Sequence, residues 1–278
     1  MALLMCAIGD NVLDRYPEEG LAFPGGSATN AAVFASRLGV ESAYIGILGS
    51  DASADFVRSS LLDEGVDVSR TRRQDAPNPT TDVVVEPDGN RRFTGYVPPV
   101  ETLDLTDEDL AFLAGMDWIH TGHTSYIDHE LSRLHGLAPI SFDFSKREMD
   151  YAAPLLRYVE VATFSRDDLP YHDCVELLEA ARAAGAQFSV VTRGAEGALA
   201  LSEDGLFEQP AAPVAVVDTI GAGDAFQTCL MAQLRAGADV PAALAAASRF
   251  AGRTCRYRGS FGHERALSEF EPTPTNVA

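Results

Sequence analysis

A short glycine-containing loop in the C-terminal half of the chain combines backbone donors with a carboxylate. Residues 218–224 read Asp-Thr-Ile-Gly-Ala-Gly-Asp and lead into an alanine-rich segment of helical period. The N–H groups of Gly221, Ala222 and Gly223 are expected at the start of that helix, unpaired within it, where the helix dipole also favours an anion. Asp224, in the first turn, is suited to accept the proton of an attacking hydroxyl group. The loop therefore predicts phosphoryl transfer, a reaction that needs positioning, charge stabilisation and one base.

Other interpretations of this loop fit its residues to different degrees. A capped helix start without chemistry has the same pattern and stays open. A dinucleotide fingerprint does not fit, because it would need glycine where Phe226 stands and would follow the first strand of the chain. Lys146 is the only lysine. Neither a G-x-x-x-x-G-K-S/T phosphate loop nor the strand lysine of a protein kinase is therefore available.

The composition is that of a globular protein with an acidic surface. Hydrophobic residues make up 46% of the 278 residues, and 41 acidic against 21 basic residues give a formal charge of −20. This balance argues against nucleic-acid binding, which needs clustered basic side chains. The apolar start lacks a basic leader and no stretch has the length of a membrane span, so we expect no membrane partner. The four cysteines are far apart and are expected to be free thiols, which favours the cytoplasm.

Short apolar runs alternate with longer segments of helical period along the chain. This is the pattern of an α/β protein with a mostly parallel central sheet flanked by helices. The branched run 214–217, directly before the glycine loop, is also expected to be a buried strand. The predicted strands are 3–8, 42–47, 118–121, 140–144, 161–164 and 188–192, and the predicted helices are 27–38, 53–64, 107–114, 129–135, 171–184, 222–236 and 241–257.

Two segments interrupt this alternation. Residues 80–86 and 91–96 are predicted strands joined by the turn Pro-Asp-Gly-Asn, and the segment 12–23 is likewise extended. We expect these inserted segments, about 12–23 and 80–97, to form a small β lid on one domain that spans residues 1–278. A lid is useful in phosphoryl transfer because water would otherwise compete as acceptor. An ordinary surface hairpin is the alternative.

A second motif in the N-terminal part narrows the interpretation. Residues 24–30 read Pro-Gly-Gly-Ser-Ala-Thr-Asn. Together with the later glycine loop, this run resembles the signatures of the ribokinase or PfkB family of carbohydrate kinases, and the likeness extends from residue 8 to about residue 260. The resemblance implies a ribokinase-like fold, a small-molecule sugar as substrate, and ATP and Mg²⁺ as cofactors. It also implies that Asp224 is the catalytic base and that the three residues before it form an anion hole.

The same resemblance implies which residues bind the sugar. Asp14, Gly25, Gly26 and Asn30 match the positions that contact it. The residue types suit this role, because a carboxylate and an amide can bind neighbouring hydroxyls while glycines let a sugar ring lie against the backbone. Asn30 has an alternative interpretation as a polar residue at a helix start.

The nucleotide is expected at another turn of the chain. Residues 190–197, Val-Val-Thr-Arg-Gly-Ala-Glu-Gly, resemble the family's turn beside the ATP phosphates. Thr192, Gly194 and Gly197 are the matching positions, and Gly221 and Gly223 are expected to continue this site.

The candidate metal-binding residues match the family's motifs less closely. Ser165 and Asp168 stand where the family has asparagine and glutamate, so Asp168 is expected to contact Mg²⁺ through water, while the serine puts the first position's role in doubt. Asp218 and the carbonyl of Ile220, with residues 258–260, resemble the monovalent-cation site of some members. This resemblance implies possible dependence on K⁺.

The acceptor is predicted from short local runs. They resemble the members of the family that phosphorylate the 6-hydroxyl of fructosamines such as fructoselysine. The departure at Ser165 fits the same members. The matching runs are 8–11, 16–17, 22–26 and 142–145.

A fructosamine carries an ammonium and a carboxylate beyond its sugar, so charged residues of the lid are expected to contact it. We predict Arg92 for this role, with Glu18, Glu19 and Arg91 as further candidates. Another ketose, ribose or a nucleoside stays open as acceptor. An ATP- or sugar-binding sensor is a further alternative, which Asp224 argues against. Family resemblance also implies a homodimer formed through the lid.

Overall fold

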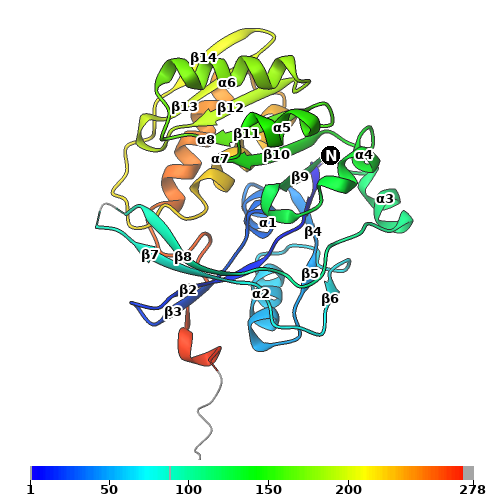
Figure 1. The fold of residues 1–278 in the computed structure, drawn as a ribbon, viewed down its shortest axis with the longest axis vertical. Coiled ribbons are helices and arrows are strands. Elements are labelled where there is room, and N and C mark those ends of the chain that lie inside the picture. The colour runs from blue at the N-terminus through cyan, green and yellow to red at the C-terminus, as the bar shows by residue number, and fades with distance from the viewer. Residues whose placement is uncertain (1, 88, 272–278) are drawn as a thin grey trace, which may run out of the picture.

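The centre of the protein is an eight-stranded sheet, which we describe from a computed structural model covering residues 2–87 and 89–271. Its strand order is β14-β13-β12-β11-β10-β9-β1-β4 (Figure 1). The strands from β12 to β4 run parallel, and β13 and β14 add an antiparallel hairpin at one edge. The bounds are β1 Leu4–Ile8, β4 Glu41–Ile45, β9 Trp118–Gly122, β10 Ile140–Ser145, β11 Val161–Ser165, β12 Phe188–Thr192, β13 Ala198–Ser202 and β14 Gly205–Gln209.

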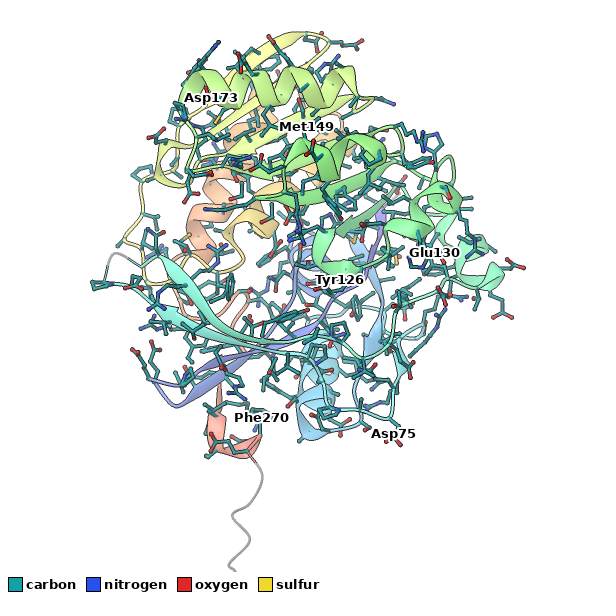
Figure 2. The ribbon with its side chains drawn as sticks, viewed as in Figure 1. Asp75, Tyr126, Glu130, Met149, Asp173 and Phe270 are labelled. Atoms are coloured by element: carbon teal, nitrogen blue, oxygen red, sulfur yellow. The ribbon has the colours of Figure 1, made fainter. Side chains whose placement is uncertain are left out.

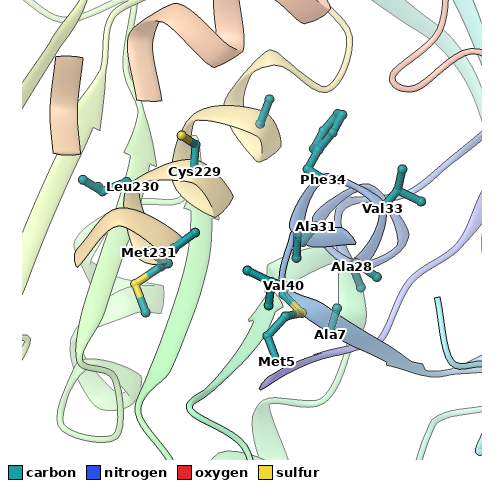
Figure 3. Close-up of a cluster of buried hydrophobic side chains, with 14 of the residues drawn as sticks. Met5, Ala7, Ala28, Ala31, Val33, Phe34, Val40, Cys229, Leu230 and Met231 are labelled. Carbon is teal, nitrogen blue, oxygen red and sulfur yellow. The ribbon is translucent and has the colours of Figure 1, made fainter. Parts of the chain in front are cut away.

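The first strand explains why the sheet is buried on both faces. Met5 and Ala7 of β1 belong to one hydrophobic cluster, and Cys6 and Ile8 belong to another. Successive side chains of a strand point to opposite faces, so a strand covered on both sides reads as a continuous apolar run. Figure 3 shows part of the first cluster, where Met5 and Ala7 lie near Val40 and Ala28.

Helices cover both faces of this sheet. Helices α1, α7 and α8 contribute to the first cluster, and α4, α5 and α6 contribute to the second. Helix α2 packs against the strands of a second, smaller sheet. The bounds are α1 Ser27–Arg37, α2 Ala52–Asp63, α3 Asp107–Leu113, α4 Leu131–Leu134, α5 Met149–Leu156, α6 Tyr171–Ala183, α7 Ala222–Arg235 and α8 Val240–Thr254.

The smaller sheet has five strands in the order β15-β3-β2-β7-β8. It contains both segments that interrupt the α/β alternation, and it lies across one side of the main layer (Figure 1). The predicted hairpin is β7 and β8, and a short β5–β6 pair stands apart. The bounds are β2 Val12–Tyr16, β3 Leu21–Gly25, β5 Ile47–Leu48, β6 Arg72–Arg73, β7 Thr80–Val85, β8 Arg91–Val97 and β15 Arg265–Ala266.

Two helix predictions differ from the structure. Helix α5 was not predicted, because Pro154 lies inside it and proline lacks the N–H that an interior helical position donates. The predicted helix 129–135 is a 3₁₀ turn, η2 (Asp128–Glu130), followed by the single turn of α4.

The prediction of a buried strand at 214–217 was wrong. This run has no strand partner, and Val216 and Val217 are each 41% exposed. Branched residues favour a strand only where a neighbouring strand offers a pairing edge. The glycine loop therefore follows an exposed connection.

Within the described part of the chain, no helix combines the length and apolarity that crossing a bilayer would need. All four cysteines are buried and free, as the sequence predicts.

Candidate active site

The start of α1 is held by a carboxylate from the end of β1. Asp10 accepts the N–H of Ser27 at Oδ2 (2.8 Å) and the N–H of Ala28 at Oδ1 (3.1 Å), so it caps a helix from another part of the chain. Gly26 precedes this helix with a φ of 113°, and a Cβ there would lie 2.7 Å from the Cα of Asn11. Only glycine fits such a close approach with positive φ.

Asp14 is a buried carboxylate on β2, with 3% of its surface exposed. A Cβ on Gly25, in the neighbouring strand, would lie 2.0 Å from Asp14 Oδ2. Burial raises the pKa of Asp14 well above its ordinary value, the charge of Asp218 raises it further, and the charge of Arg91 opposes this shift. Gly25 therefore makes room for a carboxylate that the fold holds in an unfavourable environment.

Asp224 joins the two sequence motifs. Its Oδ1 accepts the hydroxyl of Ser27 at 2.8 Å, and its Oδ2 accepts the amide N–H of Asn30 at 2.7 Å. Burial raises the pKa of Asp224 to about 7, with a further contribution from Asp143, while the hydrogen bonds from Asn30 and Ser27 lower it. Among the described residues no partner occurs for Oδ1 of Asn30, which leaves a buried acceptor beside Asp224.

The glycine loop packs closely against the rest of the protein at Gly221 and faces open space at Gly223. Gly221 has a φ of 71°, and a Cβ there would lie 2.7 Å from the Cβ of Ser260. A Cβ on Gly223 would meet nothing within 4 Å, so the loop faces open space at that residue. The N–H of Ala222 donates to the carbonyl of Thr219 at 3.2 Å, so the loop itself engages one of the three expected donors.

The predicted nucleotide residues lie on one turn between β12 and β13. Thr192 ends β12, and its hydroxyl donates to the carbonyl of Phe164 at 3.3 Å. Gly194 begins the 3₁₀ turn η3 (Gly194–Glu196) with a φ of 55°. A Cβ on Gly197 would lie 2.0 Å from the carbonyl oxygen of Gln209, so packing against β14 already requires that glycine.

Asp168 is held by a neighbouring arginine. Nε and Nη2 of Arg166 donate to its two carboxylate oxygens, both at 3.1 Å. These hydrogen bonds lower the pKa of Asp168, and its side chain is 48% exposed. The result is an ionised carboxylate in contact with both solvent and a fixed cation.

The structure does not bring Arg92 to this site. Its Nε pairs with Oε1 of Glu86 at 3.0 Å, and its side chain is 61% exposed. Arg91 points the other way, and its Nη1 donates to Oγ1 of Thr219 in the glycine loop at 3.3 Å. Neighbouring residues of a strand face opposite sides, so a choice between two adjacent arginines depends on the register of β8.

Sequence reasoning missed the roles of Asp10 and Asp143. Asp143 lies just before β10 ends at Ser145, and burial raises its pKa to about 6, with a further contribution from Asp10. Asp10 also accepts the hydroxyl of Ser125 at 3.1 Å. Both aspartates lie at the carboxyl ends of parallel strands, where α/β proteins bind ligands, and that position was the available signal.

The fold and the joined motifs are those of a phosphotransferase for sugars. The model of the pfkB family of carbohydrate kinases matches residues 10–132 and 152–263. The chain belongs to this family and is therefore a sugar kinase. Kinases of this fold use ATP and Mg²⁺.

Curated relatives extend over nearly the whole chain. It is 37% identical over 264 residues to fructosamine kinase FrlD of Bacillus subtilis, covering 93% of each chain. It is 31% identical over 262 residues to fructoselysine 6-kinase of Escherichia coli K12, covering 92% of this chain and 99% of the relative.

Two solved structures share the fold. Ribokinase of Arabidopsis thaliana, complexed with ribose and ATP, matches with a TM-score of 0.79 at 19% identity, covering 94% of this chain and 95% of that one. Aminoimidazole riboside kinase of Salmonella enterica, complexed with aminoimidazole riboside and an ATP analogue, matches with a TM-score of 0.76 at 25% identity, covering 95% and 96%. The fold is ribokinase-like.

Replacing Asp224 with asparagine is expected to stabilise the protein at alkaline pH. The folded pKa of about 7 lies above the ordinary 3.8, so the protonated carboxyl favours folding and this contribution is lost as pH rises through 7. We expect Asp224→Asn to raise the free energy of unfolding by about 2–4 kcal/mol at pH 8 and by less than half of that at pH 5. Urea denaturation at both pH values measures the difference.

Asp204→Asn is the control, because Asp204 lies in the exposed turn between β13 and β14. Its effect should be small at both pH values. If Asp224→Asn and the wild type had the same free energy of unfolding at pH 8, the ionised Asp224 carboxylate would not destabilise the fold, and the prediction would be wrong.

Proposed function

We propose that the protein transfers the γ-phosphoryl group of ATP to the 6-hydroxyl of a fructosamine such as fructoselysine. The contact between Asn30 and Asp224, at 2.7 Å, carries this proposal because it sets a sugar-binding residue beside the base. The relatives that phosphorylate fructosamine and fructoselysine support the acceptor. The small sheet acts as the lid of one kinase domain.

Asp224 is proposed to accept the proton of the sugar hydroxyl. The hydroxyl oxygen forms a bond to the γ-phosphorus, the bond from that phosphorus to the bridging oxygen of ADP breaks, and the proton moves to the Asp224 carboxylate. A pKa of about 7 suits this role, because a base works best when its pKa is near the working pH. The N–H groups of Gly221 and Gly223 are proposed to stabilise the phosphoryl oxygens, while that of Ala222 donates to Thr219 within the loop.

The sugar is proposed to lie between β2 and the start of α1. Asp14 accepts its hydroxyls, and Gly25 and Gly26 leave the room that Asp14 and the backbone at Asn11 need to form this site. Oδ1 of Asn30 lacks a partner in the described residues, so a sugar hydroxyl would satisfy it.

The nucleotide is proposed to bind across the turn 192–197 and the glycines Gly221 and Gly223. When bound, Mg²⁺ supplies charge neutralisation on the phosphates. Asp168 is suited to contact Mg²⁺ through a water molecule rather than directly. Its carboxylate is half exposed to solvent, and Arg166 already donates two hydrogen bonds to it.

Two alternative acceptors have specific support. A fructokinase of Salmonella typhimurium is 35% identical over 257 residues, which favours an unsubstituted ketose as second candidate. The structural similarity to aminoimidazole riboside kinase supports a riboside as another candidate acceptor. A sensor without turnover is disfavoured, since Asp224 keeps the contacts and the pKa that a base needs.

A homodimer through the lid is proposed as the working form, in the cytoplasm where ATP is supplied. Strand β8 ends its sheet, and Phe93, Tyr96 and Val97 on it are about half exposed. An open edge with apolar side chains is suited to pairing with a second copy. Light scattering should give twice the mass of one chain, and a monomer at all concentrations would contradict the dimer.

The acceptor is tested by measuring ADP release with Mg-ATP across fructoselysine, other fructosamines, fructose, ribose, adenosine and sugar phosphates. We expect the highest kcat/KM with a fructosamine, and a phosphorus NMR signal from a 6-phosphate product. A clear preference for fructose, ribose or adenosine would remove the fructosamine proposal. Asp224→Asn serves as control: it should bind ATP like the wild type and turn over about 10²- to 10⁴-fold more slowly.

Arg91, and not Arg92, is proposed to contact the carboxylate of the amino-acid part. We expect Arg91→Ala to raise KM for the fructosamine about tenfold or more, because a charge-assisted hydrogen bond is lost. Arg92→Ala is the matched control on the same strand and should leave KM within about twofold, because a salt bridge on the surface contributes little. Steady-state kinetics on both variants measure this, and a larger effect of Arg92→Ala would reverse the assignment.

A further inference from the structure

Asp218, the first residue of the glycine loop, is surrounded by protein donors. It has no exposed surface. Its Oδ1 accepts the N–H of Ile220 at 2.9 Å. Its Oδ2 accepts the hydroxyl of Tyr16 at 2.7 Å and the N–H of Gly259 at 3.2 Å. The carboxylate therefore links the loop to β2 and to the segment that follows α8.

This arrangement does not fit a monovalent cation at Asp218. Such an ion needs several oxygens with free lone pairs directed at it. Oδ2 uses both of its lone pairs on hydrogen bonds, and the nearby carbonyl of Cys255 already accepts the N–H groups of Val217 (2.8 Å) and Asp218 (3.3 Å). Ser260 has a buried hydroxyl without a partner among the described residues. With the carbonyl of Ile220, the other predicted ligand, and one lone pair of Oδ1, it leaves fewer oxygens than the ring that replaces such an ion's hydration shell.

Fixed cations also flank the loop. Arg91 donates to the hydroxyl of Thr219 at 3.3 Å, and Arg258 lies near the carbonyl of Val217 at 3.5 Å while pairing with Glu19 at 2.9 Å. Guanidinium groups remain charged at every accessible pH. Positive charge beside Asp218 is therefore present without a bound ion.

Tyr16 is a permanent donor in this contact. It is 1% exposed, and burial raises its pKa, with further contributions from Asp14 and Asp218. The hydroxyl therefore stays protonated throughout the range in which the protein works. Tyr16 also lies two residues from Asp14 on β2, so both side chains are on the same face of the strand.

We propose that Tyr16 is a positioning residue that holds Asp218 and the glycine loop, and that its hydroxyl takes the place of a monovalent cation. The kinase then works without K⁺, unlike the family members that its sequence resembles at this loop. The same contact fixes the distance between the strand that carries Asp14 and the loop that carries Asp224. The activity readout rests on the proposed function, whereas the binding readout below does not.

The test compares initial rates in KCl, NaCl and tetramethylammonium chloride at equal ionic strength, with the acceptor that the substrate panel identifies. Wild-type rates should agree within about twofold, because no ion is needed. Tyr16→Phe should lose about 10- to 100-fold in tetramethylammonium chloride, the effect of losing a hydrogen bond to a charged group. KCl should restore part of this loss, because the vacated lone pair of Oδ2 becomes available.

Tyr151→Phe is the matched control. Tyr151 also donates its hydroxyl to a carboxylate, that of Asp128, at 2.8 Å, but on α5 and away from the loop. Its response to the three salts should equal that of the wild type. A tenfold activation of the wild type by KCl, or a Tyr16→Phe variant that behaves like the wild type in all three salts, would overturn the proposal.

A second measurement does not depend on catalysis. An ion that binds the folded protein raises its melting temperature by mass action. We expect equal melting temperatures of the wild type in the three salts, and a rise confined to KCl would overturn the proposal even if Tyr16→Phe did not fold. If no acceptor is phosphorylated, the proposed function fails while this comparison still decides the inference.

Discussion

The hydrogen bonds that Asp224 accepts from α1 are the contact on which the site depends. Ser27 and Asn30 come from the N-terminal motif, and Asp224 comes from the first turn of α7. Both helices begin at the carboxyl edge of the central sheet, so the positive ends of two helix dipoles face the same carboxylate. Those dipoles and the two donors offset part of the free energy that burying Asp224 costs.

Negative charge is concentrated around this contact. Asp14 is buried, Asp143 and Asp224 are partly buried, and the charges of neighbouring aspartates, Asp10 among them, help to raise the pKa of each of the three. Such crowding works against stability and is typical of sites that bind or react. Hydroxyl donors of a sugar would satisfy these acceptors, so binding relieves a cost that the unliganded fold carries. The fold tolerates these neighbouring carboxylates because they are not part of the two apolar clusters that pack against the central sheet.

The sequence predicted the layers better than the contacts between them. The continuous apolar run of β1 and the turn of the β7–β8 hairpin are local signals, and both elements formed as expected. The strand prediction for residues 214–217 was wrong because strand propensity does not show whether a neighbouring strand is available for pairing.

The site was predictable only where a motif was local. Gly25 and Gly26 could be identified, but their reason, the close approach of Asp14 and Asn11, needs the fold. Arg91, not Arg92, lies beside the glycine loop, and sequence alone does not separate the two because a difference of one residue reverses the face of a strand. The contact between Tyr16 and Asp218 joins residues 202 positions apart, and nothing in either local sequence predicts it.

A kinase must hold two substrates in a fixed relative position, and the two sites proposed above lie on different parts of the fold. The proposed sugar site is on the small sheet and α1, and the proposed phosphate site is on the glycine loop before α7. The contacts that join these parts include three from different elements: Asn30 with Asp224, Tyr16 with Asp218, and Arg91 with Thr219. All three end on the glycine loop, although they start from α1, β2 and β8. Figure 2 shows a further link, Tyr126, between the main layer and the small sheet, where its hydroxyl lies 3.5 Å from that of Tyr96.

A displacement of reacting groups by about 1 Å can lower a rate by about two orders of magnitude, so the number of such contacts matters. Links to residues 218, 219 and 224 restrict both the position and the orientation of α1 and the small sheet relative to the glycine loop. The glycine loop is therefore the common reference for both substrates. Residues 218, 219 and 224 each make one of these contacts, so the loop positions other parts of the fold in addition to the anion binding proposed for its glycines.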